Sequence, residues 1–184
     1  YPFLATKYLN STLIEKFIGK FSQFANEDTD QLCTALIENP ALTIDMVLAY
    51  PDLPWDWNLL SLNMIINDIL DHPELNWNWG RVSRNHSVTI DIVLSTRDKP
   101  WNWICLSDHP NITMSDIESH MDLPWVWCSY GVSNNPNVTM TMIEAHSDKP
   151  WDWNRVSLHM KLTVDLLTQY RDKPWDFYSM SKWN

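Results

Sequence analysis

The sequence predicts an all-α fold, an α-solenoid of short helix-turn-helix repeats with an N-terminal capping helix. A tryptophan motif occurs six times, and successive leading tryptophans are 22, 24, 24, 26 and 24 residues apart. A fixed period of about 24 residues is typical of repeat architectures. Apolar residues recur at three- and four-residue spacings, and no stretch alternates apolar and polar residues as a half-buried strand does.

The first 30 residues lack the motif and are predicted to cap the array. Six apolar residues recur at the spacing of an amphipathic helix, with Thr12 as its N-cap: Leu13, Ile14, Phe17, Ile18, Phe21 and Phe24. Solenoids need an end piece that covers the apolar face of their first repeat. Residues 31–37 resemble the second helix of a repeat without its tryptophans. We therefore expect a cap over residues 1–30 and one continuous array over residues 31–184.

Each repeat is predicted to open with a short helix that begins after a polar N-cap, whose side-chain oxygen accepts a backbone N–H. The predicted caps are Thr43, Asn67, Thr89, Thr113, Thr139 and Thr163. The threonines lie 12 residues before the next leading tryptophan, whereas Asn67 lies 10 residues before Trp77. This difference predicts a two-residue deletion in the helix that follows Asn67. An acid three residues before each leading tryptophan marks the end of this helix and suits capping better than cation binding.

A second helix is predicted to run through both tryptophans of each motif and to end at a serine. Proline usually precedes the leading tryptophan, and its fixed φ suits the first helical position. Residues two apart on a helix point about 200° apart, so the two rings cannot share a face. We assign the second ring of each motif to the repeat core: Trp57, Trp79, Trp103, Trp127, Trp153 and Phe177.

The leading tryptophans are the candidate interaction stripe. A helix that is apolar on two faces suits an element between its own first helix and the next repeat, so a structural role is the first interpretation. The alternative is that the leading ring is partly exposed and forms a binding stripe. The residues concerned are Trp55, Trp77, Trp101, Trp125, Trp151 and Trp175.

The composition excludes several classes of function. The formal net charge is −10, with 13 Lys and Arg against 23 Asp and Glu, so the chain lacks the basic stripe that nucleic-acid binding requires. No apolar run approaches the roughly 20 residues of a membrane span. The chain has three glycines, too few for a phosphate-binding glycine-rich loop. We expect no nucleic acid, no membrane and no cofactor.

No residue set indicates catalysis or metal binding. The three cysteines, Cys33, Cys105 and Cys128, are an odd set without CxxC spacing, which favours free buried thiols in a reducing compartment. His109 and His159 occupy a repeat position that otherwise holds asparagine, so closing a helix end explains them better than a metal does. We predict that the protein is not an enzyme and has no catalytic residues and no metal site.

The repeat unit resembles tandem repeats in proteins of giant, nucleocytoplasmic large DNA viruses. It consists of Asn-Pro-Asn-(Ile/Val)-Thr, some eight residues, Asp-Lys-Pro-Trp-Asp-Trp and Leu/Val-Ser, and its copies cover about residues 39–181. The departures from this pattern are Asn76 for proline, Val126 for the acid or amide, and Phe177 for tryptophan. The resemblance implies a viral repeat protein of the virion or host cytoplasm, and no signal peptide suggests secretion.

The function predicted from the sequence is a non-enzymatic scaffold or protein–protein interaction module with an unidentified protein partner. One alternative is a virion structural, minor capsid-associated component. Another is a carbohydrate-binding surface module, which would need the leading tryptophans in water. Because the chain stops inside the second helix of its sixth copy, we also expect that the natural protein continues or that this open repeat is covered by a partner or by self-association.

Overall fold

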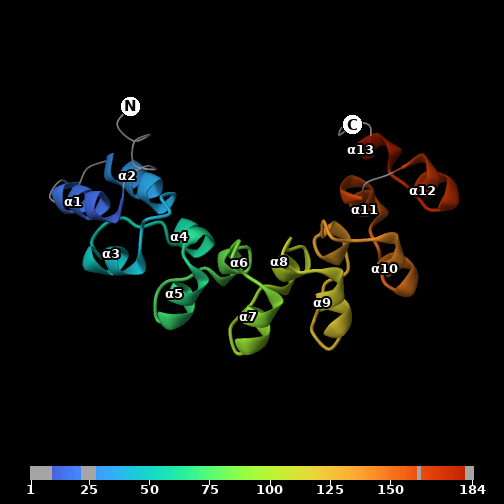
Figure 1. Ribbon diagram of the computed structural model, residues 1–184, viewed down its shortest axis with the longest axis horizontal. Helices are drawn as coiled ribbons and strands as arrows, with labels where there is room; N and C mark the ends of the chain where they lie inside the picture. The colour runs from blue at the N-terminus through green and yellow to red at the C-terminus, as the bar shows by residue number, and fades with distance from the viewer. Residues whose placement is uncertain (1–9, 22–27, 161–162, 181–184) are drawn as a thin grey trace. The chain divides into compact units, whose positions relative to one another are not determined.

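Every regular element of the computed structural model is a helix, which confirms the all-α class for the residues that the structure describes: 10–21, 28–160 and 163–180 (Figure 1). The chain divides into two compact units, Tyr1–Ser87 and Val88–Asn184. This division falls within the predicted array and not at residue 30.

The first unit contains α1 to α6, with α2 packed against α4 and α4 against α6. Helix α1 begins one residue before Thr12, and the N-cap is Asn10, whose Oδ1 accepts the backbone N–H of Leu13 at 3.0 Å. Ile14 and Ile18 are buried as predicted, Leu13 is exposed, and Phe24 lies outside the described residues. The bounds are α1 Ser11–Phe21, α2 Asp28–Ile37, α3 Ile44–Ala49, α4 Trp57–Asn63, α5 Ile66–Asp71 and α6 Trp79–Val82.

The second unit contains α7 to α13 and one short 3₁₀ helix, η2. Helix α11 packs against both η2 and α13. The bounds are α7 Ile90–Ser95, α8 Trp103–Ser107, α9 Met114–Ser119, η2 Val132–Asn134, α10 Met140–Ala145, α11 Trp153–His159, α12 Val164–Gln169 and α13 Phe177–Met180.

The first helix of every repeat has six residues, and threonine caps most of them as predicted. The hydroxyls of four caps accept a backbone N–H from the first turn: Thr43, Thr113, Thr139 and Thr163. Thr113 also forms a capping box with Asp116, whose carboxylate accepts the N–H of Thr113 at 2.8 Å. Thr89 occupies the N-cap position without a side-chain hydrogen bond.

The predicted cap Asn67 is wrong. Helix α5 begins at Ile66, and its N-cap is Ile65, which has no side-chain oxygen and makes no capping bond. Ile65 lies 12 residues before Trp77, the spacing of every other cap. The deletion therefore falls between Ser61 and Ile65, where α4 ends at Asn63 and only Met64 separates it from the cap of α5. Helix α5 keeps its full length, and Asn67 lies inside it.

The second helices begin at the second tryptophan of the motif and not at the first, which corrects the predicted start. The residue between the two tryptophans is the N-cap, and its side chain accepts first-turn N–H groups: Asp56, Asn78, Asn102 and Asp152. Asp and Asn are among the strongest N-caps, and this preference outweighs proline at the first helical position. The leading tryptophan precedes the helix, in a tight turn where the N–H of Trp101, for example, donates to the carbonyl of Lys99 at 2.8 Å.

The fourth repeat has no second α-helix, although one was predicted up to Ser133. Between Trp125 and Asn135, all of which the structure describes, the chain forms turns and only η2. Val126 stands at the N-cap position without a side-chain oxygen. The spacing of 26 residues from Trp125 to Trp151, two more than the usual period, indicates a two-residue insertion, and the stretch 128–131 that contains it forms a loop. Gly131 closes this loop: its backbone lies so near Val126 that an added Cβ would be 1.8 Å from the Val126 carbonyl oxygen.

A buried serine links consecutive repeats within each unit. Ser107 Oγ donates to the Trp103 carbonyl at 2.6 Å and accepts the N–H of Val126, in the next repeat, at 2.9 Å. The same two bonds are made by Ser61, Ser133 and Ser157. Ser133 keeps its bond to the Trp127 carbonyl across the insertion, so the link survives where the helix is lost.

A buried asparagine adds a second link. The side-chain amide of Asn135 donates to the carbonyls of Ser107 and Ile112 at 3.0 Å and of His109 at 3.2 Å. Asn85 contacts the carbonyls of Ser61 and Met64 in the same way in the first unit. These amides close the end of the preceding helix, as the exchange of asparagine and histidine at this position predicts.

Candidate functional site

The leading tryptophans are structural residues. In all six motifs the indole Nε1–H donates to the carbonyl five residues earlier, at 2.8–3.0 Å, and that carbonyl belongs to the C-cap of the first helix. The indole thus satisfies a carbonyl that the short helix leaves without a partner. The structural interpretation therefore fits better than the alternative of an exposed stripe, which is wrong for five residues with 7–8 % exposure, namely Trp55, Trp77, Trp101, Trp125 and Trp175. Trp151 alone is half-buried.

The second rings, which the sequence assigned to the core, are only half-buried. Four of them contact the leading ring of the next repeat edge-to-face, with centroids 5.0–5.3 Å apart and interplanar angles of 80–88°, in the pairs Trp57–Trp77, Trp103–Trp125, Trp127–Trp151 and Trp153–Trp175. Trp79 is half-buried as well. Phe177 is 64 % exposed, so its assignment to the core is wrong.

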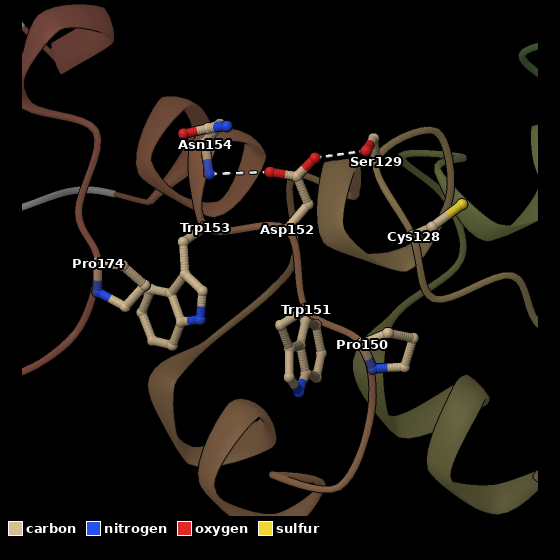
Figure 2. A pocket seen from close by; sticks show the side chains of 8 residues that line it. All are labelled: Cys128, Ser129, Pro150, Trp151, Asp152, Trp153, Asn154 and Pro174. Carbon is tan, nitrogen blue, oxygen red and sulfur yellow. Dashed lines mark hydrogen bonds between the residues drawn. The ribbon is translucent and has the colours of Figure 1, made fainter.

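The broken fourth repeat opens a groove of about 420 Å³ in the second unit, which we call the insertion groove (Figure 2). The insertion contributes two residues to its lining, the fifth tryptophan motif and the residue after it contribute five, and the sixth motif contributes Pro174. Its lining is Cys128, Ser129, Pro150, Trp151, Asp152, Trp153, Asn154 and Pro174. An adjoining hollow of about 570 Å³ shares Pro150, Trp151, Trp153 and Pro174 and adds the charged residues Glu144, Lys149, Asp172 and Lys173.

Asp152 is the charged centre of the insertion groove. One carboxylate oxygen accepts the backbone N–H groups of Asn154, at 2.9 Å, and Arg155, at 3.4 Å, while the other accepts the hydroxyl of Ser129. The Ser129 hydroxyl, and after it these backbone N–H groups, hold the pKa of Asp152 below its ordinary value. The carboxylate is therefore ionised at neutral pH, and it is the only charged group among the described residues that line the groove.

The lowered pKa of Asp152 gives a pH dependence that its replacement by asparagine removes. The pKa of this carboxyl is lower in the folded chain than in the unfolded chain. The ionised carboxylate therefore stabilises the fold above the unfolded pKa of about 4, and this stabilisation is lost as the pH falls below that value. We expect the stability advantage of the wild type over Asp152→Asn to shrink between about pH 4 and pH 2. Urea unfolding of both proteins across this range measures it, and a constant difference would contradict the assignment.

The lysines beside the groove have partners of their own. Lys149 Nζ lies 3.2 Å from Asp148 Oδ2 and 5.5 Å from the centroid of the Trp127 ring. Lys173 Nζ lies 5.8 Å from the Trp153 centroid. Both are held by cation–π contacts with the second ring of the preceding repeat. Both lysines line the adjoining hollow, whereas the charged residue in the lining of the insertion groove is Asp152.

The cysteines differ in accessibility. Cys33 and Cys105 are buried as predicted, but Cys128 is exposed, because the insertion carries it out of the helical packing into the groove. Burial, and secondarily the charge of Asp30, raises the pKa of the Cys33 thiol to about 11. Within the described ranges, no group of three or more His, Cys, Asp or Glu side chains could hold a metal ion.

None of the helices that the structure describes is long and apolar enough to cross a membrane.

The chain matches no known protein family, no curated protein and no solved structure. The insertion groove and the contacts between repeats are therefore the features from which a function can be inferred. Sequence reasoning named Trp151 in the candidate stripe and Trp153 in the repeat core, but it missed the other residues that line the groove. Val126 and the insertion were both visible as departures from the repeat.

Proposed function

We propose that the chain is a non-enzymatic repeat scaffold that binds a protein partner through the insertion groove. The observation that carries this proposal is that the repeat is interrupted at one place and a groove opens there. Insertions within a structural repeat form loops, often on the binding face. Val126 and the insertion replace a helix by a loop, yet Ser133 and Asn135 keep the fourth repeat linked to its neighbours. The loop thus changes the surface of the fourth repeat and preserves its contacts with the neighbouring repeats.

The proposed scaffold is an α-solenoid, the array expected over residues 31–184 with its cap over residues 1–30. Solenoid repeats contact their sequence neighbours and depend on repeated interfaces. The serine links, the asparagine links and the edge-to-face tryptophan pairs recur between consecutive repeats within each unit. These recurring contacts support the solenoid.

The resemblance of the repeat unit supports a viral origin, with the virion or the host cytoplasm as the proposed location. The carbohydrate-binding alternative needed the leading tryptophans in water, and the burial of five of them removes its basis. No observation favours a virion structural component over a scaffold. We therefore keep the interaction module as the single proposed function.

Selective alkylation of Cys128 tests the proposed function. A bulky maleimide should react with exposed Cys128 and spare the buried Cys33 and Cys105. Affinity purification from infected cells with mass spectrometry would use three tagged proteins: the untreated chain, the alkylated chain and a Cys128→Ser variant treated with the same reagent. We expect a protein that the untreated chain and treated Cys128→Ser capture and the alkylated chain does not. If no captured protein distinguishes the three, the proposal is overturned.

A further inference from the structure

We infer that the insertion groove receives an extended, proline-rich peptide segment that carries a lysine or arginine. This inference rests on the proposed protein-binding function and specifies the chemistry of the partner. It follows from the walls of the groove, from its size and from the charge at its centre.

The walls of the groove are rings. The half-buried indoles of Trp151 and Trp153 and the exposed pyrrolidines of Pro150 and Pro174 line it, as Figure 2 shows. Aromatic-lined grooves of this kind accept polyproline II segments, whose rings pack on tryptophan and whose stiff backbone loses little entropy on binding. A polyproline II segment also needs no ladder of backbone hydrogen bonds from its receptor.

Other modes of peptide recognition fit less well. Strand addition requires an exposed sheet edge, and the described part of the chain contains no strand. Recognition of a helix in a groove requires a row of apolar anchor positions along one face of the helix. The insertion groove offers two indoles and two prolines around a single carboxylate. This short, ring-lined groove therefore suits an extended segment better than a helix.

The charge at the centre of the groove favours a cationic partner. A carboxylate accepts about four hydrogen bonds, and Asp152 already accepts three, from Ser129, Asn154 and Arg155. The guanidinium of Arg155 lies over the Tyr130 ring, with Cζ 5.5 Å from its centroid. A lysine or arginine of the partner would add a charge-assisted bond to the carboxylate. The net charge of −10 also favours a basic segment over an acidic one.

Binding of a fluorescein-labelled peptide of four Pro-Pro-Lys repeats, followed by anisotropy, tests the inference. We expect saturable binding to the full chain and about tenfold weaker binding to Asp152→Asn, as for the loss of one charge-assisted contact. Asparagine caps the equivalent helices at Asn78 and Asn102, so this variant retains its fold. The matched control is Asp56→Asn in the first repeat, the same exchange at the equivalent cap, for which we expect unchanged binding.

Two altered peptides and the thiol complete the experiment. Glutamate in place of lysine should weaken binding about tenfold or more, and glycine in place of proline should weaken it because the stiff extended conformation is lost. Bound peptide should also slow the alkylation of Cys128. No saturable binding by the full chain, or equal effects of Asp152→Asn and Asp56→Asn, would overturn the inference. Protein capture that depends on Cys128 would then still support the proposed function, whereas the failure of both experiments would reject both proposals.

Discussion

Replacing Gly131 by alanine is expected to lower the unfolding free energy by about 3 kcal/mol, the upper part of the range for overpacking of a close-packed site. The added Cβ would lie 1.8 Å from the carbonyl oxygen of Val126 and 2.7 Å from its carbonyl carbon, and neither backbone atom can rotate away. The same carbonyl accepts the N–H of Val132 at 2.7 Å, so relief of the clash breaks this bond as well.

Urea unfolding followed by far-UV circular dichroism measures this effect, with Tyr130→Ala as the control in the same loop. Tyr130 is 65 % exposed, and its truncation should change stability by no more than about 0.5 kcal/mol. A Gly131→Ala variant as stable as the control would show that the loop does not approach Val126 this closely. The insertion groove would then lose the wall that Cys128 and Ser129 provide.

The all-α class and most caps could be predicted because they depend on local sequence. Helical spacing and a threonine before each first helix are local signals, and four of the five threonines make the expected capping bond. Asn67 misled the prediction because it was chosen for its side chain. The constant spacing of 12 residues to the leading tryptophan would have placed the cap at Ile65.

The roles of the two tryptophans were interchanged for one physical reason. The prediction placed both rings on one helix, whereas the helix begins at the second. The signal was present in the sequence, because Asp or Asn stands between the rings in most motifs and is a strong N-cap. With the start placed there, the leading ring becomes a residue that closes the first helix, and the second ring becomes the one between repeats.

The insertion groove could not be predicted from the sequence, because it depends on the path of a loop. Val126, the insertion and Gly131 indicate that the fourth repeat differs, but they do not specify which way the chain turns. The close approach of Gly131 to Val126 and the bond between Ser129 and Asp152 determine that path. Both contacts involve residues of the insertion, and the regular spacing of the repeats does not predict where an inserted loop lies in space.

Replacing Trp125 by alanine is expected to cost about 4 kcal/mol, within the range for truncation of a buried aromatic ring. Trp125 is 7 % exposed, its indole N–H donates to the His120 carbonyl at 2.8 Å, and its ring meets Trp103 edge-to-face with centroids 5.2 Å apart. The alanine variant loses both the link to the preceding repeat and the closure of its own first helix, so urea unfolding should show a large fall in the midpoint.

Trp125→Phe separates the two contributions, because it keeps an aromatic ring and removes the indole N–H. We expect it to cost about 1–2 kcal/mol, the loss for a buried carbonyl left without its donor. Ile104→Ala, at a residue 46 % exposed in the same unit, should cost less than either. A Trp125→Ala cost near that of Ile104→Ala would mean that the ring does not hold the repeats together. A loss of unfolding free energy that decreases in the order Trp125→Ala, Trp125→Phe, Ile104→Ala would instead establish that the leading tryptophan acts mainly through ring burial between repeats. The proposed partner binding would then belong to the surface where the repeat is interrupted.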